Sequence, residues 1–159
     1  MITAYRYCGS AEETDSIVFL ANEMQKTSSR YRDLEFNETR VREILNLAAT
    51  NPDEYCFFVA MSGNIAVGFI GLAISENFLN HGYTAFDLGF YVLPYCLDKD
   101  AGELLLNLAI WKCDVLKVPL VMSSSTGINP EIYGRYLRKF GFAERGRSWE
   151  RPKSALQFE

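Results

Sequence analysis

The sequence predicts an α/β fold in which helices cover a mixed sheet, with the element order βααβββαβαβ. Two observations carry this prediction. Apolar residues recur at helical spacing over residues 11–26 and 101–114. Runs rich in branched and aromatic residues, bounded by turn residues, lie between them over 54–61, 65–75 and 84–93. A crossover through the 101–114 helix then gives the sheet both antiparallel and parallel neighbours.

The composition indicates one domain over residues 1–159 and excludes several classes of protein. The net charge of -4 gives no support for a nucleic-acid partner, which normally needs a basic patch. Four scattered cysteines and a single histidine predict no metal site, and reduced thiols indicate a cytoplasmic location. The sequence has no apolar run of membrane-spanning length and no secretory signal, so we expect no membrane partner.

The first part of the chain predicts one strand and two helices. Residues 2–7 can form the strand. Ser10 and Glu13 then have the spacing of a capping box, in which each side chain satisfies the other residue's free N–H, at the start of a helix over about residues 11–26. Asn37 can cap the second helix, whose apolar residues repeat the same spacing.

Two strands follow as a hairpin. The turn residues Ser62-Gly63-Asn64 connect the runs 54–61 and 65–75, which is a strong hairpin signal. The next connection, residues 76–83, contains His81, the only histidine of the sequence. His81 is a candidate base, although a lone histidine in a loop is more often simply solvated.

The central segment consists of a strand, a loop and a helix. The strand over 84–93 ends at Pro94, and the polar loop Asp98-Lys99-Asp100 leads into a helix over about 101–114. The N–H groups and dipole at the start of such a helix make a generic anion site, but the segment can equally be an ordinary connection. If the helix packs on the sheet, its buried residues are expected to be Leu104, Leu105, Leu108 and Trp111.

The last part of the chain predicts a short strand over 120–124 and a closing helix. Asn129 is a good N-cap for that helix, and Gly141 supplies the turn at its end. Residues 142–151 can form a further strand. A final strand over 155–158 is expected to be short or absent, because few residues remain.

Two of these segments resemble the GNAT acyltransferases. Val92-Leu93-Pro94, followed by a loop, Gly102 and a leucine run, is similar to the family's central segment, in which a loop of pattern Arg/Gln-x-x-Gly-x-Gly/Ala binds the diphosphate of acetyl-CoA. Residues 129–142 are similar to the family's closing helix, which ends in Gly-Phe. The resemblance covers about residues 1–152. It implies the GNAT fold and transfer of an acetyl group from acetyl-CoA to a primary amine.

The resemblance also implies a binding site for acetyl-CoA, and this sequence departs from the family's pattern there. The Arg/Gln position falls on Leu97, the first glycine on Asp100, and only Gly102 is kept. Three acids stand where the diphosphate would lie, although Asp100-x-x-Glu103 also has the form of a capping box. The cofactor-binding residues implied by position are Tyr91, Val92, Leu97, Lys99, Asp100, Ala101, Gly102 and Asn129.

Catalytic residues can be carried over in the same way. Asp87 falls close to the position of the family's acidic base, but it can also be a polar residue on the open face of a strand. Gly89 would permit a distortion of that strand. The family's tyrosine position, which protonates the leaving thiol, falls on Leu137. Tyr136 and Tyr133 are the neighbouring substitutes, and they can alternatively belong to an apolar stripe of the helix.

The resemblance leaves the acceptor and the activity open. Arg30, Tyr31 and His81 are candidate substrate residues, since the connection over 26–36 often shapes the acceptor site in the family; it can also be a solvated loop. The acceptor can be a small molecule or a protein amine, and an oligomer is compatible with the sequence. The alternative function is an inactive GNAT-fold binding or structural protein that has lost its cofactor. Such proteins also occur in bacteriophages, so the resemblance is compatible with a role in the virion. The third hypothesis is an α/β domain unrelated to this family.

Overall fold

The computed structural model describes residues 1–96, 100–123 and 129–146. The chain divides into two compact units, Met1–Gly127 and Ile128–Glu159, and each is described by itself. The prediction of a single domain therefore stays a prediction. Among the described residues, no helix has both the length and the apolar character needed to cross a membrane.

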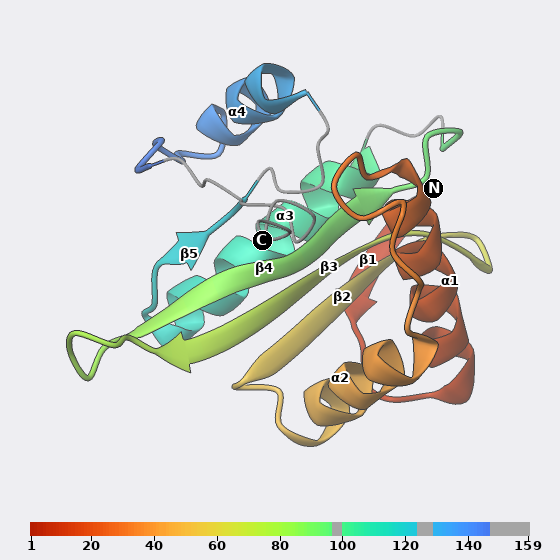
Figure 1. Cartoon of the computed structure of the whole chain (residues 1–159), viewed down its shortest axis with the longest axis horizontal. Coiled ribbons are helices and arrows are strands. Elements are labelled where there is room, and N and C mark those ends of the chain that lie inside the picture. The colour runs from red at the N-terminus through yellow and green to blue at the C-terminus, as the bar shows by residue number, and fades with distance from the viewer. Residues whose placement is uncertain (97–99, 124–128, 147–159) are drawn as a thin grey trace, which may run out of the picture. The chain divides into compact units, whose positions relative to one another are not determined.

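The first unit is built on one mixed sheet of five strands in the order β1-β2-β3-β4-β5 (Figure 1). The first four strands are antiparallel neighbours, and β5 pairs with β4 in parallel through α3 (Asp100–Leu116), as a crossover requires. The strand bounds are β1 Ile2–Arg6, β2 Tyr55–Ser62, β3 Ile65–Glu76, β4 Tyr83–Val92 and β5 Leu120–Val121. The predicted mixed sheet and its antiparallel neighbours are thus confirmed, although β5 is shorter than predicted.

Helices α1 (Ala11–Thr27) and α2 (Glu38–Thr50) cover one face of the sheet, and α3 covers the other (Figure 1). The apolar stripes of α1 and α2 meet inward-facing aromatic and branched residues of the strands, so that a core lies between these two helices and β2, β3 and β4. The buried members of this core include Ile17, Leu20, Leu45, Phe57, Val59, Phe69 and Tyr91.

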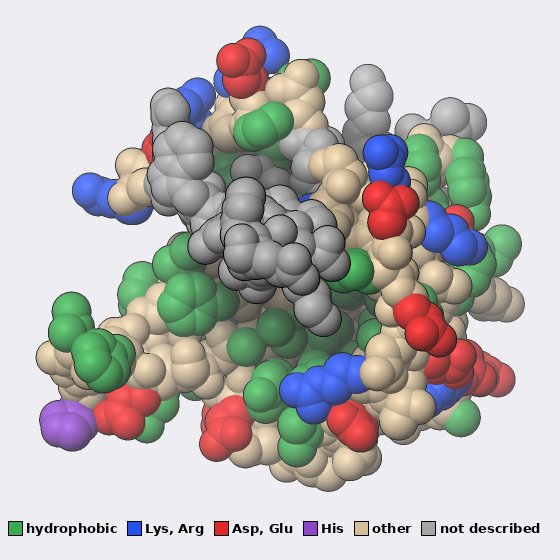
Figure 2. Space-filling view, viewed as in Figure 1, with side chains coloured by type: hydrophobic (Ala, Val, Ile, Leu, Met, Phe, Trp, Pro, Cys, Tyr) green, Lys and Arg blue, Asp and Glu red, His purple; other side chains and the backbone are tan. Residues whose placement is uncertain are grey.

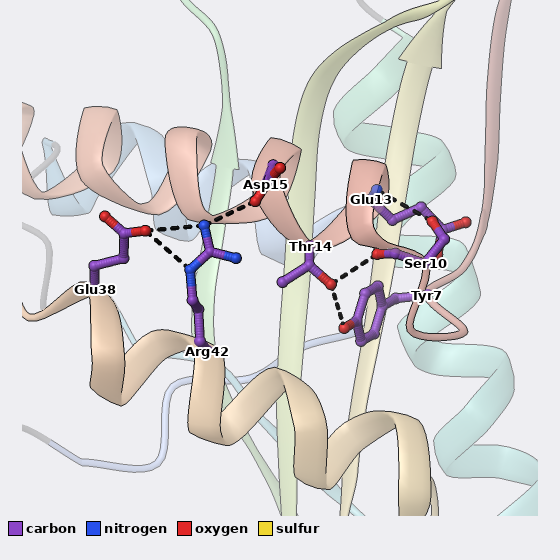
Figure 3. A network of polar contacts seen from close by, with 7 residues as sticks. All are labelled: Tyr7, Ser10, Glu13, Thr14, Asp15, Glu38 and Arg42. Carbon is purple, nitrogen blue, oxygen red and sulfur yellow. Dashed lines mark hydrogen bonds and ion pairs between the residues drawn. The ribbon is translucent and has the colours of Figure 1, made fainter.

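Polar contacts fix the start of α1 and join it to α2 (Figure 3). The Ser10 hydroxyl accepts the Glu13 N–H at 3.2 Å, which confirms one half of the predicted capping box. The Glu13 carboxylate reaches the backbone N–H of Cys8 instead of that of Ser10. Arg42 of α2 donates to Asp15 of α1 at 2.7 Å, an exposed ion pair that solvent screens and that therefore contributes little to stability.

Helix α3 packs on the sheet, but with a different face from the one predicted. Leu105 is buried, Leu104 and Leu108 are only half-buried, and Trp111 is 56% exposed. The expected burial of Trp111 is therefore wrong. The helix is apolar over more than one face, so spacing alone could not select the buried stripe. The residues that face the sheet are Ala101, Leu105, Leu106, Ala109, Lys112 and Cys113.

The second unit contains α4 (Pro130–Arg138). The Asn129 side chain accepts the N–H groups of Glu131 and Ile132, which confirms the predicted cap. Gly141 adopts a φ of +85° after the helix, the left-handed turn that favours glycine. Residues 142–146 are irregular, so the predicted strand over 142–151 does not form in its described part, and residues 155–158 lie outside the described residues.

Candidate functional site

The middle of β4 is irregular. Asp87 lies opposite Leu72 of β3 and Gly89 lies opposite Gly71, so Leu88 has no cross-strand partner. One extra residue in an antiparallel strand is a β-bulge, which bends the strand and increases its twist. Because cross-strand partners share a face and successive residues alternate, the bulge places Asp87 and Gly89 on opposite faces of the sheet.

The pairing between β4 and β5 stops just before this bulge. Ala85 pairs with Leu120 and Phe86 pairs with Val121, and no further pair of these two strands is formed within the described residues. β4 nevertheless continues to Val92, with its other edge bonded to β3. The backbone N–H and C=O groups of residues 87–92 that point away from β3 are thus not paired with β5. Backbone groups of a strand that are not paired with a neighbouring strand can hydrogen-bond an extended ligand.

Asp87 lies at the point where the two strands part. Its Oδ1 accepts the backbone N–H of Ser123 at 2.9 Å, so the carboxylate bridges β4 and the segment after β5. Burial raises the pKa of Asp87, and hydrogen bonds from the Ser123 N–H and hydroxyl oppose that rise. The side chain is half-buried rather than on an open face. A carboxyl group with a raised pKa is a stronger proton acceptor than an exposed aspartate.

Two other predicted residues of β4 face the core. Tyr91 is buried under α1, and burial raises its pKa, so its side chain does not line the open edge and only its backbone groups can meet a ligand there. At Gly89 an added Cβ would lie 3.0 Å from the Met24 methyl group and 3.2 Å from the Phe69 ring. The glycine therefore allows α1 to approach the strand closely. Val92 is half-buried at the end of β4.

The start of α3 is acidic. Its first turn contains Asp100 and Glu103, while Ala101 is fully buried and Gly102 is half-buried. The helix begins at Asp100, so Asp100 lies in its first turn, and Leu97 and Lys99 lie outside the described residues. Acids in a first turn stabilise a helix by about 0.3–1 kcal/mol. Their charge also opposes a phosphate at the same helix terminus.

The predicted substrate residues lie on two separate connections. Arg30 lies 5.0 Å over the Tyr31 ring, in a turn whose N–H groups bond the buried Ser28 hydroxyl. His81 lies in the β3–β4 hairpin, where its Nδ1 is 2.8 Å from a Glu76 carboxylate oxygen. At about 3.3 Å per residue, roughly 13 Å of strand separate the start of β4 from Asp87, so the structure does not bring His81 and Asp87 together.

The remaining candidates belong to the second unit. The Tyr136 ring packs against Phe140 with centroids 5.2 Å apart, and Tyr133 and Tyr136 are both half-buried beside the buried Leu137. The Asn129 side chain oxygen caps α4 and is engaged there. Among the described residues of the chain, no group of three or more acidic, histidine or cysteine side chains could hold a metal ion.

Comparisons with known proteins identify the fold. No protein-family model and no curated protein matches the sequence. The structure is similar to that of the aminoglycoside N-acetyltransferase AAC(6')-Iy in complex with a CoA bisubstrate analogue, at 13% identity over 96% of this chain and 98% of that chain, with a TM-score of 0.75. It is also similar to glucosamine-6-phosphate N-acetyltransferase from Arabidopsis thaliana, at 10% identity over 96% and 99%, with a TM-score of 0.72.

The chain has the GNAT fold. A further structure with this fold, an aminoglycoside acetyltransferase from an uncultured soil metagenomic sample, is 13% identical over 96% of this chain and 98% of that chain, with a TM-score of 0.70. The predicted GNAT fold is thereby confirmed. A distortion of this strand was expected at Gly89, and the structure has it as the bulge at Leu88, whereas the contact with Ser123 was not predicted from the sequence. Gly89 was the only local signal of an irregular strand.

Proposed function

We propose that the chain is an N-acetyltransferase that moves an acetyl group from acetyl-CoA to a primary amine. The observation that carries the proposal is the parting of β4 from β5 at Asp87, next to the bulge at Leu88. This arrangement leaves backbone groups of β4 that are not paired with β5, beside a carboxylate whose pKa is raised by burial. The similarity to N-acetyltransferases, one of them solved with a CoA analogue, supports the same function.

In the proposed reaction, the edge of β4 that is not paired with β5 binds acetyl-CoA and orients it. Backbone N–H and C=O groups of residues 87–92 would hold the amide-containing arm of acetyl-CoA in the way that they would hold a neighbouring strand. Acetyl-CoA supplies a thioester carbonyl. Backbone N–H groups fixed by the bulge are suited to stabilise negative charge on the carbonyl oxygen, because they need no reorganisation during the reaction.

Asp87 is proposed as the general base. An amine attacks only in its neutral form, so a proton must leave the ammonium group before or during attack. Burial raises the pKa of Asp87 towards the range in which a carboxylate accepts that proton effectively. Tyr133 or Tyr136 of α4 is proposed to return a proton to the leaving thiolate. The Ser123 N–H bond holds the carboxylate in place at the point where the strands part.

The acceptor is proposed to be a small-molecule amine, because the similar enzymes are named for an aminoglycoside or for glucosamine 6-phosphate. Arg30 and Tyr31 would contribute to its site from the connection between α1 and α2. The acidic first turn of α3 favours a second candidate function, a GNAT-fold binding protein that does not bind acetyl-CoA. In the enzyme, Lys99 would have to offset the charges of Asp100 and Glu103.

Calorimetric titration with acetyl-CoA distinguishes the two functions. The enzyme is expected to show saturable binding, and thiol release with a panel of aminoglycosides and amino sugars is expected to depend on Asp87. Asp114→Asn, a change of an exposed aspartate on α3, is the matched control and is expected to keep both properties. A folded protein that shows no binding at millimolar acetyl-CoA would exclude the enzyme and leave the binding protein.

A further inference from the structure

Three cysteines of the first unit lie near one another. Cys8 follows β1, Cys56 lies in β2 and Cys113 lies in α3, and all three are free thiols. The charge of Cys8 influences the pKa of Cys56, and that of Cys56 influences the pKa of Cys113. Cys56 and Cys113 are 1% and 3% exposed, whereas Cys8 is exposed. A reagent in solution therefore meets Cys8 first.

The pairing of β1 with β2 brings Cys8 opposite Cys56. Beyond the last strand pair of β1, Tyr7 donates its N–H to the Phe57 carbonyl oxygen at 2.8 Å, so the antiparallel register continues past the end of the strand. The next step along this register pairs Cys8 with Cys56. The Cys8 N–H points away from β2, to the Glu13 carboxylate at 3.2 Å. This is the geometry of an antiparallel pair whose two residues do not hydrogen-bond each other.

The two cysteine side chains also point to the same face of the sheet. Tyr7 and Phe57 both belong to the core under α1 and α2. Because successive residues of a strand alternate, their neighbours Cys8 and Cys56 point to the other face, on which α3 packs. Cys56 is accordingly near enough to Lys112 of α3 for the ammonium charge to influence its pKa. Register and alternation therefore agree on the placement of the pair.

A disulfide fits this placement. Opposite residues that do not hydrogen-bond each other have Cα atoms about 4.5 Å apart, with their side chains close together. Disulfides join residues whose Cα atoms are about 4.4–6.8 Å apart. The backbone of Cys8 and Cys56 thus meets the requirement without a rearrangement of the sheet.

We propose that Cys8 and Cys56 form a reversible disulfide site, in which the exposed Cys8 reacts first with a small disulfide such as glutathione disulfide. The Cys8 thiolate attacks one sulfur of the oxidant, which releases a glutathione thiolate and leaves a mixed disulfide on Cys8. The Cys56 thiolate then attacks the Cys8 sulfur and releases the second glutathione. Two protein thiols are oxidised, one glutathione disulfide is reduced, and the two thiol protons pass to the two glutathione molecules.

The surroundings of the two thiols suit these different steps. The Arg6 guanidinium lies 4.0 Å from Sγ of the exposed Cys8, where its charge can attract an anionic oxidant such as glutathione disulfide. Burial raises the pKa of Cys56 to about 11, so this thiol is seldom ionised at neutral pH and the second step is expected to be the slower one. The charged and titratable groups near Cys56 are Arg6, Cys8, Asp53, Lys112 and Cys113.

The disulfide closes a ring over residues 8–56. This ring contains α1 and α2 (Figure 1), whose charged side chains spread over the right-hand part of Figure 2. In the unfolded chain residues 9–55 separate the two thiols, whereas in the fold they lie on neighbouring strands. Closing the ring is therefore expected to favour the folded state. The site adds to the proposed acetyltransferase and does not depend on that activity.

Thiol–disulfide exchange with glutathione measures the reaction in the full chain. The protein is equilibrated in mixtures of reduced and oxidised glutathione, remaining thiols are blocked with N-ethylmaleimide, and the peptides are mapped by mass spectrometry. We expect a Cys8–Cys56 link, preceded by a mixed disulfide on Cys8. The equilibrium constant for closing this link is expected to be at least tenfold larger in the folded chain than in urea, because the fold holds the two thiols together.

Single variants test the role of each thiol. Cys56→Ala is expected to stop at the mixed disulfide on Cys8, and Cys8→Ser is expected to form neither product. Cys113→Ala removes another buried thiol of the same face and is the matched control, expected to form the link as the parent does. The peptide map of the parent does not depend on the folding of any variant.

Four outcomes would overturn the proposal. They are a folded parent that stops at the mixed disulfide, a parent that links Cys56 to Cys113 instead, a control variant that loses the link, and an equilibrium constant that is no larger in the folded chain than in urea. The last of these would mean that the fold does not hold Cys8 and Cys56 in a geometry that a disulfide can join.

Discussion

Asp53, just before β2, and Asp87, in the middle of β4, are both hydrogen-bonded aspartates, yet their surroundings move their pKa values in opposite directions. The Lys112 ammonium donates to Asp53 at 2.9 Å, and this hydrogen bond and its charge lower the pKa of Asp53. At Asp87 the bonds to Ser123 act in the same sense, but burial is the larger influence and raises the pKa. The charged form is therefore favoured at Asp53 and disfavoured at Asp87.

The difference is the one expected between a structural anchor and the general base that we propose for Asp87. The Asp53 side chain is 72% exposed, whereas that of Lys112 is 10% exposed, so the pair ties the buried stem of an α3 lysine to the start of β2. Asp87 has no cation bonded to it among the described residues and lies where β4 and β5 part. Carboxylates whose charged form is disfavoured are concentrated at functional sites, while paired ones are commonly structural.

The largest expected effect is that of Asp87→Asn on turnover. Loss of a general base is expected to lower turnover by about 10²- to 10⁴-fold at acidic and neutral pH, with a smaller loss at high pH where free amine is abundant. A pH–rate profile of acetyl transfer measures this. Asp53→Asn serves as the control and is expected to leave the profile unchanged. An identical pH–rate profile for Asp87→Asn and the parent would show that Asp87 is not the general base. The contrast between Asp87 and Asp53 would then carry no functional meaning.

Asp100 adds a third carboxylate, whose charge is expected to oppose cofactor binding. Changing Asp100 to Gly together with Leu97 to Arg replaces an acid in the first turn of α3 by a nearby cation. This is expected to tighten acetyl-CoA binding about five- to a hundredfold, or roughly 1 to 3 kcal/mol. Calorimetric titration of both forms is the measurement. A parent that already binds at micromolar levels would show that the Asp100 charge is directed away from the phosphates.

The Asp53–Lys112 pair is expected to respond differently to loss of each partner. Asp53→Ala leaves an ammonium group on a largely buried side chain without its bonded carboxylate, and is expected to lower the free energy of unfolding by up to about 1 kcal/mol, given that Asp53 itself is exposed. Lys112→Met removes the charge but keeps the buried stem, so its effect is expected to be smaller. Urea unfolding of both variants measures the difference. Equal losses would mean that loss of the ion pair accounts for both effects and that the unpaired Lys112 ammonium has no additional cost.

The elements of the first unit could be predicted because local signals were strong. Ser10 and Asn37 cap helices as predicted, and Gly63 has the positive φ of +59° that the predicted hairpin turn requires. The buried face of α3 was predicted only in part, since Leu105 is buried and Trp111 is exposed. Its apolar residues surround the helix, and one polar contact of its buried face, Lys112 with Asp53, joins residues far apart in the sequence.

The geometry around the candidate site was not predictable from the sequence. Asp87 could be placed by resemblance, yet the bulge at Leu88 depends on how β3 and β4 align, which the sequence of β4 alone does not determine. Tyr91 was expected near the cofactor, and its side chain is instead in the core, because the pairing of Tyr91 with Phe69 turns it towards α1. Register decides which face a strand residue occupies, and a single extra residue reverses it.

The smallest expected effect is that of Asp87 and Asp53 on the pH dependence of stability. The folded-state pKa of Asp87 is raised, so its contribution is present below the unfolded pKa and is lost as pH rises through the folded pKa. Asp87→Asn escapes this loss and can still accept the Ser123 N–H, so we expect it to be more stable than the parent at neutral pH by less than about 1 kcal/mol, and equally stable in acid.

Asp53→Asn is expected to do the reverse: the pKa of Asp53 is lowered, so its contribution is present at neutral pH and lost as pH falls through the folded value. Urea unfolding between about pH 3 and pH 8 compares the two variants with the parent across the range of carboxyl titration. If both variants lose stability at neutral pH, the Ser123 bond outweighs burial at Asp87, and the two aspartates are anchors of the same kind.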